Sequence, residues 1–307
     1  MTASPTKKAP AVSVICPVAG PAPFLESTLV SVLTQTISDW ELLLIDNGCD
    51  GDLTAIAQRD GRIRVIAEPR RGIAIARNTG LREATGRFVA FIDSDDVWEP
   101  EKLALQVAHL EGAAADAGVY TAFDLIDDTG ALIGKGWAPP VITYRGLCRG
   151  EGIIAGSNVM LRRSVLGAVG PLNEQLTFSA DEDLLFRVTL EHKLAFIDRV
   201  LLHYRMHTLN ASKNYALVYR AMLELVIHYS QTPGGRAPAE VRDDRRTGTK
   251  RIRMTYSAQA FDRFRATRHE QPLRALGHLY RSVRMSWRWP LGELCRRLVR
   301  SVARSRS

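Results

Sequence analysis

The chain of 307 residues is 46% hydrophobic and 24% charged, which fits an ordinary globular protein with one large α/β domain and an appendage. It has no apolar run near the roughly 18–20 residues that span a bilayer and no apolar stretch in its first ten residues, which argues against a membrane span and a signal peptide. Its four cysteines form no CxxC pair, so we expect no zinc site or disulfide framework and a reducing, cytoplasmic setting.

The net charge of +8 is unevenly distributed along the chain. Residues 231–307 hold 19 Lys and Arg against 6 Asp and Glu, a net charge of +13, which leaves −5 for residues 1–230. A mildly acidic body followed by a strongly basic end indicates that the positive charge serves a separate function.

Strands and helices alternate through the first 112 residues, the pattern of a mainly parallel sheet with helices on both faces. We expect the first strand at Val12–Cys16, ended by Pro17 and by the Gly20-Pro21 pair. The segments expected next are a helix at 24–36, a strand at 41–45, a helix at 53–57, a strand at 63–66, a helix at 73–83, a strand at 88–92 and a helix at 100–112.

Beyond residue 112 the pattern is less regular. Residues 117–150 mix short strands with Gly and Pro turns, and residues 231–250 are polar with Pro and Gly, which is typical of a linker or mobile loop. The remaining expected segments are an apolar run at 153–161, a helix at 183–191, strands at 194–197 and 200–204, and a helix at 215–230.

Carboxylates follow the most apolar of the predicted strands. Phe88–Ile92 is a continuous apolar run, as expected for a strand covered on both faces, and Asp93, Asp95 and Asp96 come directly after it. Open α/β sheets bind ligands at the carboxyl ends of their strands, and Asp93 and Asp95 can share one hard divalent cation. The alternative is an acidic turn in which a carboxylate such as Asp96 caps the helix that begins near Pro100.

Residues 72–103 as a whole resemble the family 2 glycosyltransferases, which have the GT-A fold and move sugars from nucleotide-sugar donors. The similarity rests on a long pattern: Gly72, three residues, Ala-Arg-Asn, one residue, Gly-Leu, and then Phe-x-Asp-Ser-Asp-Asp followed two residues later by x-Pro. It extends over about residues 11–213 and fades beyond them. The resemblance implies an α/β fold of the GT-A type, a mainly parallel sheet flanked by helices, with a C-terminal helical extension.

The resemblance also implies a domain organisation and an activity. Residues 1–10 would be a flexible start, 11–112 the nucleotide-sugar half, 113–213 the acceptor half, and 214–307 a basic helical region with a linker at 231–250. The expected activity is inverting transfer of a sugar, assisted by Mg²⁺ or Mn²⁺, from a nucleotide-diphosphate sugar to a hydroxyl of a saccharide or lipid-linked acceptor. Such a reaction belongs to the synthesis of cell-surface polysaccharide or glycoconjugate.

On the donor side, the resemblance places Pro17 and Val18 in the loop whose backbone lines the nucleotide base, although a plain turn is the alternative. Asp46 and Asn47 match an acidic pair whose second member typically binds uracil. Asn47 departs from that pattern but can still accept the uracil N–H, which leaves a UDP-sugar favoured and GDP- or dTDP-sugars open. Asp46 could instead cap the next helix.

Five further residues are assigned to the donor and the cation by the resemblance. Arg77 carries a fixed positive charge suited to the base or diphosphate, Asp93 with Ser94 would hold the ribose or a water on the metal, and Asp95 would bind the metal. His207, within a stretch similar to the family's YRxHxxNxS, could complete the metal's coordination. The alternatives are an ordinary surface Arg and a hydrogen-bonded surface His.

On the acceptor side, Ser179–Leu190 is similar to the family's EDxDLxxR element and places Asp181 at the catalytic base. An inverting transfer needs one carboxylate to take the acceptor hydroxyl's proton, and Glu182 is held in reserve because a shift of one residue in the alignment would promote it. The alternative is an acidic helix N-terminus. Gly156–Asn158 and Trp137 fit an acceptor pocket or plain structural roles equally well.

The basic C-terminal region predicts two amphipathic helices, at 273–287 and 291–304. Apolar faces edged by Arg suit an anionic membrane, so we expect a cytoplasmic protein held peripherally on the inner face of the cell membrane; packing on the domain or on a partner is the alternative. No recognised nucleic-acid motif is present, so no such partner is expected. The first face holds Leu273, Leu276, Leu279, Tyr280, Val283 and Trp287 beside Arg274, Arg281, Arg284 and Arg288; the second holds Leu291, Leu294, Leu298 and Val302 opposite Arg296, Arg297, Arg300 and Arg304.

Other functions remain as alternatives. A nucleotidyltransferase that forms nucleotide sugars shares the α/β layout and an acidic metal site, but a Gly-rich phosphate loop with a basic residue is expected after its first strand, and PVAGPAP is not one. A relative that only binds nucleotide sugars is disfavoured by the intact Asp95 and Asp181. A dehydrogenase is disfavoured because the chain lacks GxGxxG.

Overall fold

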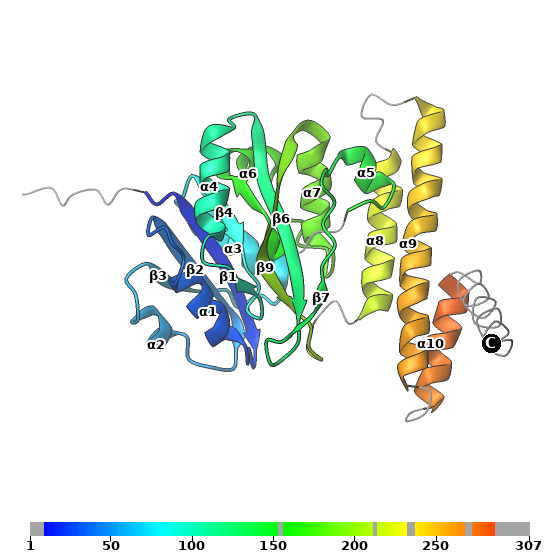
Figure 1. The fold of residues 1–307 in the computed structure, drawn as a ribbon, viewed down its shortest axis with the longest axis horizontal. Coiled ribbons are helices and arrows are strands. Elements are labelled where there is room, and N and C mark those ends of the chain that lie inside the picture. The colour runs from blue at the N-terminus through cyan, green and yellow to red at the C-terminus, as the bar shows by residue number, and fades with distance from the viewer. Residues whose placement is uncertain (1–8, 153–155, 211–213, 232–236, 268–271, 286–307) are drawn as a thin grey trace, which may run out of the picture. The chain divides into compact units, whose positions relative to one another are not determined.

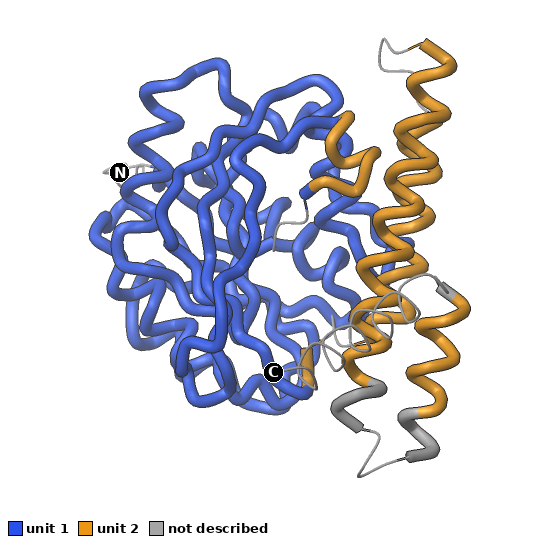
Figure 2. The backbone as a smooth tube through the Cα atoms, turned by 45° about the vertical axis from the view of Figure 1, so that its right-hand side comes forward, with its two compact units in different colours: residues 1–144, 152–208 blue, residues 145–151, 209–307 orange. Residues whose placement is uncertain are grey.

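The computed structural model describes residues 9–152, 156–210, 214–231, 237–267 and 272–285 (Figure 1). The chain divides into two compact units, coloured in Figure 2: residues 1–144 with 152–208, and residues 145–151 with 209–307. The second unit therefore begins a few residues before the boundary predicted at 213/214, and it also takes a short segment from the middle of the chain.

The first half of unit 1 is a parallel sheet with alternating helices, as the sequence predicted. Its strand order is β3-β2-β1-β4, with every neighbouring pair parallel. Side chains from β1, β2 and β4 are almost wholly buried, because a parallel sheet is covered on both faces. The elements are β1 (Val12–Gly20), α1 (Leu25–Leu33), β2 (Trp40–Cys49), α2 (Thr54–Ala57), β3 (Ile63–Ala67), α3 (Ile73–Glu83) and β4 (Phe88–Phe91).

The second half of unit 1 extends the same sheet with mixed pairing, in the order β4-β8-β6-β9-β5 with β7 beside β6. β6 and β9 are parallel, whereas β8, β5 and β7 pair antiparallel with their neighbours. Helices flank the sheet (Figure 1). The elements are β5 (Val97–Trp98), α4 (Lys102–Gly112), β6 (Asp116–Ile126), β7 (Leu132–Lys135), the 3₁₀ turn η1 (Gly156–Asn158), β8 (Met160–Arg162), α6 (Arg163–Val169), α7 (Ala180–Glu191) and β9 (Lys193–Arg205).

The first strand does not end at Pro17, contrary to the prediction. The Ile15 carbonyl accepts a hydrogen bond from the Ile92 N–H, so the backbone of residues 15 and 17 faces β4. Pairing between β1 and β4 stops at Ile15 and Phe91, two residues before Pro17. Because nothing on that side requires the N–H that proline lacks, Pro17 costs no ladder hydrogen bond and the strand continues to Gly20.

The two strand pieces predicted at 194–197 and 200–204 form one strand, β9. Its register against β6 shifts where Ile197 and Val200 face the consecutive residues Thr121 and Ala122. Asp198 and Arg199 bulge out at that shift and are exposed, which explains why the alternating apolar pattern breaks there. The bulge bends a continuous strand rather than ending it.

Unit 2 consists of helices: α5 (Tyr144–Cys148, mostly in this unit), α8 (Tyr215–Gln231), α9 (Pro238–Thr267) and α10 (Pro272–Met285). The linker predicted at 231–250 is wrong for residues 238–250, which are helical. Pro238 suits the first helical position, where no backbone N–H is needed, and the Glu240 carboxylate accepts a hydrogen bond at 3.0 Å from the Ala237 N–H. None of the helices within the described part of the chain is long and apolar enough to cross a bilayer.

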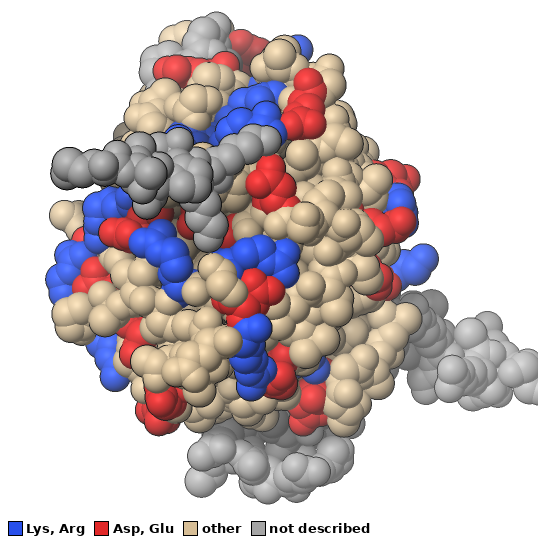
Figure 3. Space-filling model, turned by 90° about the vertical axis from the view of Figure 1, so that its left-hand side faces the viewer, with Lys and Arg blue, Asp and Glu red and all other residues tan. Residues whose placement is uncertain are grey.

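Ion pairs lie on the surface of unit 1. Basic and acidic side chains are interspersed on the face shown in Figure 3. Arg59 pairs with Glu26 at 2.7 Å, and Arg64 pairs with Glu83 at 2.6 Å. Exposed pairs of this kind contribute at most about 1 kcal/mol each. The mixed surface agrees with the small net charge of residues 1–230.

Candidate active site

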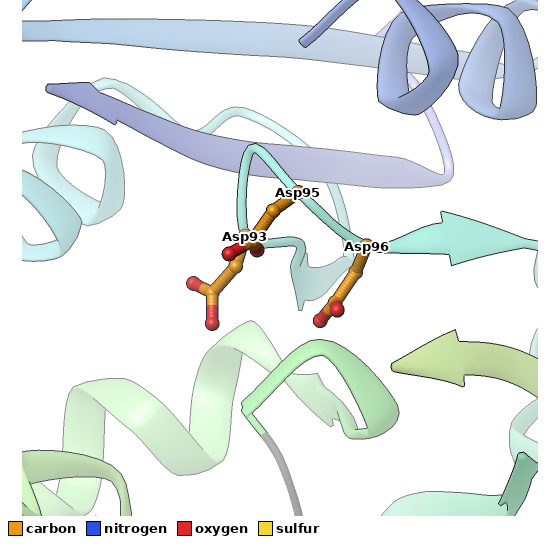
Figure 4. Close-up of side chains that lie close together, drawn as sticks. All are labelled: Asp93, Asp95 and Asp96. Atoms are coloured by element: carbon orange, nitrogen blue, oxygen red, sulfur yellow. The ribbon is translucent and has the colours of Figure 1, made fainter. Parts of the chain in front are cut away.

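Three carboxylates lie together on the turn that follows β4. One oxygen from each of Asp93, Asp95 and Asp96 lies within 4.8 Å of the others, and Figure 4 shows all three side chains on the loop between β4 and β5. Strand β4 is buried along its whole length and brings this turn to the carboxyl edge of the sheet. The two acidic residues assigned to a cation therefore lie close together, and Asp96 joins them.

Strand β9 and helix α1 hold the acidic turn in place. The Arg205 backbone N–H donates to the Asp96 carboxylate at 3.0 Å, and its side chain donates to the Asp95 carbonyl at 2.8 Å. The Thr28 hydroxyl donates to the Asp96 carbonyl at 2.8 Å. Asp96 is not a helix cap, because the N-cap of α4 is Glu101. Its buried carboxylate instead joins the turn to the end of β9.

His207 reaches the same turn from beyond the end of β9. Its Nε2 atom lies 2.8 Å from the Asp95 carboxylate, and its ring packs at 4.7 Å between centroids against Phe24. The imidazole is almost fully buried, so it is not the plain surface His of the alternative reading. The structure thus brings together Asp93, Asp95 and His207, the three residues proposed to hold a metal.

The chemistry of this donor set fits a hard divalent cation. Burial raises the pKa of Asp96 well above its ordinary value, and the charges of Asp95 and Asp93 raise it further. Burial also raises the pKa of Asp93, against the opposing effect of Arg77. Ionisation of crowded carboxyl groups is unfavourable, but it becomes favourable when a dication neutralises their charge. Mg²⁺ prefers oxygen ligands of this kind, and Mn²⁺ also binds carboxylate oxygens.

Arg77 connects the acidic turn to helix α7. It lies on α3, is buried, and donates to the Asp93 carboxylate at 2.5 Å and to the Asp181 carboxylate. Burial alone would lower the pKa of Arg77, but Asp181 and Asp93 together raise it above its ordinary range. A buried guanidinium bridging two carboxylates is not an ordinary surface Arg, and it sets the proposed base beside the proposed metal site.

The 3₁₀ turn η1 lies against this bridge. A Cβ atom on Gly156 would come within 2.5 Å of the Asp181 carboxylate, so no other residue fits there without displacing it. The Ser157 hydroxyl accepts the Asp93 N–H at 3.0 Å, and its carbonyl accepts the Trp98 indole N–H at 2.9 Å. Of the two readings left open for this segment, the structural turn describes buried Ser157 and Asn158, while Gly156 borders the site.

The acidic start of α7 gives its three carboxylates different surroundings. Asp181 faces Arg77, while Asp183 pairs within the helix with Arg187 at 3.0 Å. Burial, followed by the charge of Asp181, raises the pKa of Glu182 to about 7. Asp181 is therefore the one that Arg77 links to the acidic turn, and Glu182 beside it has a pKa near neutral pH.

The residues assigned to the nucleotide base lie at the ends of β1 and β2. Val18 and Asp46 are paired neighbours across the two parallel strands, and Pro17 is the buried residue before Val18. The Asp46 carboxylate accepts the N–H groups of Gly48 at 3.0 Å and Cys49 at 2.9 Å. Asp46 therefore caps its own turn and not helix α2, whose N-cap is Leu53.

Asn47 has a structural role that the sequence analysis missed. Its side-chain amide donates to the carbonyls of Glu68 at 2.9 Å and Arg70 at 2.7 Å, and its oxygen accepts the Gly72 N–H at 3.0 Å. Both amide hydrogens are thus used to fix the loop that leads into α3. Contact with a base stays a prediction, and it would involve the second lone pair of the oxygen.

Asn78, next to Arg77 on α3, was also missed. Its amide donates to the Leu172 carbonyl at 2.9 Å and accepts the Leu172 N–H at 2.9 Å, the pairing that two strands would make. The same amide donates to Glu174 at 3.0 Å. Asn78 thereby anchors the segment that leads to α7. Two adjacent residues of α3 therefore act together: Arg77 holds the proposed base, Asp181, and Asn78 holds the chain segment that leads to it. The Arg-Asn pair is visible in the sequence, but its distant partner is not.

A buried hydrogen-bond network around Lys102 holds the end of η1. The Lys102 ammonium donates to Gln106 at 2.6 Å and lies 4.5 Å from the centre of the Trp98 ring. Gln106 in turn donates to the Asn158 carbonyl at 3.2 Å. Burial lowers the pKa of Lys102 to about 7, since no carboxylate compensates its charge.

We expect this lysine to make stability depend on pH. Between about pH 7 and its unfolded pKa near 10.4, the unfolded chain binds a proton at Lys102 that the folded chain has released. The free energy of unfolding should then rise with pH across that window, by up to about 1.4 kcal/mol per unit, and this contribution should be constant below pH 7. Urea denaturation of the wild type and of Lys102→Met from pH 6 to 10 measures the difference.

Lys193→Met, at an exposed lysine, is the matched control and should keep the wild-type slope. If Lys102→Met runs parallel to the wild type over the whole range, Lys102 is charged in the folded protein.

Comparison with known proteins places these features in a family. The family described as Glycosyl transferase family 2 matches residues 13–170, just over half of the chain. A β-1,3-glucosyltransferase of Escherichia coli, WfgD, named for UDP-Glc and α-D-GlcNAc-diphosphoundecaprenol, is 35% identical over 46% of this chain and 56% of its own. The putative teichuronic acid biosynthesis glycosyltransferase TuaG of Bacillus subtilis is 35% identical over 52% of this chain.

The chain spans 56% and 65% of the length of these two relatives. Among solved structures, S. aureus TarS residues 1–349 in complex with UDP-GlcNAc superimposes with a TM-score of 0.59 at 15% identity, over 90% of this chain and 91% of that one. A likeness at that identity concerns the fold, whereas the family match covers the acidic turn, the Arg77 helix and η1. The chain therefore belongs to glycosyltransferase family 2 and has a GT-A-like α/β fold.

Proposed function

We propose that the protein is an inverting glycosyltransferase that moves a sugar from a nucleoside-diphosphate donor to an acceptor hydroxyl. One observation carries the proposal: Arg77 joins Asp93 of the acidic turn to Asp181 at the start of α7. A cluster suited to a dication and a carboxylate suited to proton abstraction thus lie on either side of one buried guanidinium. This arrangement suits a reaction in which a diphosphate leaves while a hydroxyl is deprotonated.

In the proposed reaction Asp181 takes the proton of the acceptor hydroxyl as its oxygen attacks the anomeric carbon. The bond to the nucleoside diphosphate breaks on the opposite face of the sugar, so the configuration inverts. A divalent cation, when held by Asp95 and Asp93 with Asp96 and His207 beside them, would neutralise charge on the departing diphosphate. Ser94, which is half-buried on the same turn, would contact the nucleotide-sugar donor.

Arg77 has a second role in this proposal, which is to couple donor binding to the release of Asp181. The Asp181 carboxylate is engaged by the Arg77 guanidinium, so it must be released before it can meet an acceptor hydroxyl. The donor diphosphate offers Arg77 a stronger anionic partner, which would loosen its hold on Asp181. Donor binding would thereby activate the base only when a sugar is in place.

The donor and acceptor are inferred from the relatives. UDP is favoured because WfgD is named for UDP-Glc and the matched TarS structure holds UDP-GlcNAc, although Asn47 leaves GDP- and dTDP-sugars open. A saccharide or lipid-linked acceptor in polysaccharide synthesis is favoured by the names of WfgD and TuaG. A lipid-linked acceptor would require the enzyme to work at a membrane surface on the cytoplasmic side.

A thermal-shift screen of UDP-, GDP- and dTDP-sugars, each with Mg²⁺, Mn²⁺ or EDTA, tests the proposal. A ligand at 100 times its Kd stabilises the native state by about 2.7 kcal/mol, so a true donor should raise the midpoint in the presence of metal. Incubation with the donor that shifts the midpoint, followed by detection of released nucleoside diphosphate, checks turnover. A midpoint that none of these nucleotides moves would contradict the proposal.

A further inference from the structure

Helix α10 packs on α9 through a narrow polar seam. The hydroxyls of Ser257 on α9 and Ser282 on α10 each donate to the other residue's carbonyl at 2.9 Å, and both residues are buried. His278, one helical turn before Ser282 and therefore on the same side of α10, lies 2.7 Å from the Tyr215 hydroxyl of α8. The side of α10 that faces its own unit is thus polar.

The opposite side of α10 is apolar and exposed. Leu276, Tyr280 and Val283 are four and three residues apart, so they share one face of the helix, and their exposed fractions are 58%, 64% and 46%. A helix that packs on its own domain buries its apolar face and leaves its charges in water. Within its own unit, the described part of α10 shows the reverse.

Of the residues predicted for this face, Leu279 is only half-exposed. The side chains of Leu273 and Arg274, together with Trp287, Arg288 and the whole second segment at 291–304, lie outside the described residues.

Charge identifies the partner that this face suits. Arg284 is exposed and flanks the apolar face, whereas the Arg281 side chain donates to the Tyr215 hydroxyl at 3.3 Å. Helix α10 contains no acidic residue. From Arg251 to Ser307 the sequence has 14 Lys and Arg and 3 Asp and Glu. An apolar helix face bordered by arginines matches an anionic lipid surface, where the side chains enter the interface and the guanidinium groups meet the phosphates.

We propose that the exposed face of α10, Leu276, Tyr280 and Val283 with Arg284, is a docking surface for anionic phospholipid. The proposal does not depend on the proposed donor chemistry, because the acidic turn, Arg77 and Asp181 all lie in unit 1. Attachment would be reversible and salt-sensitive, since a few apolar side chains and several arginines supply it.

Co-flotation of the full-length protein with vesicles tests the surface. We expect binding to phosphatidylcholine vesicles that contain a quarter phosphatidylglycerol, little binding to pure phosphatidylcholine, and loss of binding in 0.5 M NaCl. Leu276→Ser/Tyr280→Ser/Val283→Ser should weaken binding at least tenfold. Arg284→Gln should weaken it about fivefold, the effect of one arginine near an anionic surface.

Leu132→Ser/Ile133→Ser is the matched control, because these residues of β7 are equally exposed at 64% and 55% but lie in unit 1. This double variant should bind vesicles like the wild type, and all variants should keep turnover of a soluble donor and a wild-type melting temperature. The melting temperature distinguishes a face that binds lipid from a face that the chain itself covers, because only substitutions in a covered face should lower it.

Three outcomes would overturn the proposal. Wild-type protein that ignores anionic vesicles at low salt has no lipid surface. A triple variant that binds normally but melts several degrees lower shows that the chain itself covers this face. A wild-type dimer in solution that the triple variant converts to a monomer, with vesicle binding unchanged, shows that a second copy occupies it.

Discussion

Asp181→Asn is expected to lower the rate of transfer by about 10²- to 10⁴-fold, the usual contribution of a positioned general base. The amide cannot take the acceptor's proton, yet it keeps the shape of the carboxylate beside Gly156. The Asp93 carboxylate still pairs with Arg77, so the donor site should be intact. Steady-state kinetics should show a fall in kcat, while titration with the nucleoside diphosphate gives an affinity close to that of the wild type.

Glu182→Gln is the discriminating partner of this variant, because it removes the neighbouring carboxylate and leaves the pairing of Asp181 with Arg77 in place. We expect it to retain most of the activity. An inactive Glu182→Gln together with an active Asp181→Asn would assign the base to Glu182, whose pKa of about 7 suits proton abstraction near neutral pH. Asp183→Asn is a poor control because Asp183 anchors Arg187.

Asp95→Asn is expected to abolish metal-dependent turnover of the donor. The substitution removes an anionic ligand from the acidic turn and replaces it with an amide that binds hard dications weakly. The fold should tolerate the change, because the Asp95 contact to Arg205 uses the backbone carbonyl, which the variant retains. Mn²⁺ affinity, measured by the paramagnetic relaxation of water protons, should fall with the activity.

Asp198→Asn, at an exposed carboxylate on the bulge of β9, is the control and should bind Mn²⁺ and turn over the donor normally. Unchanged Mn²⁺ binding in Asp95→Asn would remove that residue from the metal site. Loss of binding with unchanged activity would show instead that the reaction does not use the metal.

Much of the fold could be predicted from local pattern. Helix α3 was predicted at its observed bounds because Gly72 precedes it and its apolar residues recur at helical spacing. The bend in β9, the short helix α6 and the helical start of α9 were missed. The bend depends on pairing with a strand far along the chain, whereas the start of α9 has a local signal in Pro238 and Glu240 that the polar composition concealed. Asp198, for example, reads as the end of a strand until the pairing with β6 is known.

The candidate site divides in the same way. The acidic turn and the start of α7 are local motifs, and the sequence located both. Their meeting through Arg77 joins residues 104 positions apart, which no spacing within one element reveals. The roles of Asn47 and Asn78 were hidden because a side-chain amide that bonds to a distant backbone carries no sequence pattern of its own.

The segment 145–151 has a consequence for how this protein can be divided. It leaves unit 1, joins the helices of unit 2, and returns. Arg149 and Arg145 pair there with the buried Asp244 of α9, at 2.9 and 3.1 Å, and a side chain on Gly248 would collide with the Cys148 carbonyl at 2.1 Å. A chain cut after Thr208 would keep this segment but lose every partner it has in α9.

Each unit is therefore built from two separate segments of the chain, and one unit does not simply follow the other in sequence. Grafting another enzyme's C-terminal helices onto residues 1–208 should give an insoluble product unless the donor's equivalent of 145–151 is exchanged as well. The unit that must be exchanged is discontinuous, so recombination between relatives needs three crossover points, before residue 145, after 151 and after 208, rather than one.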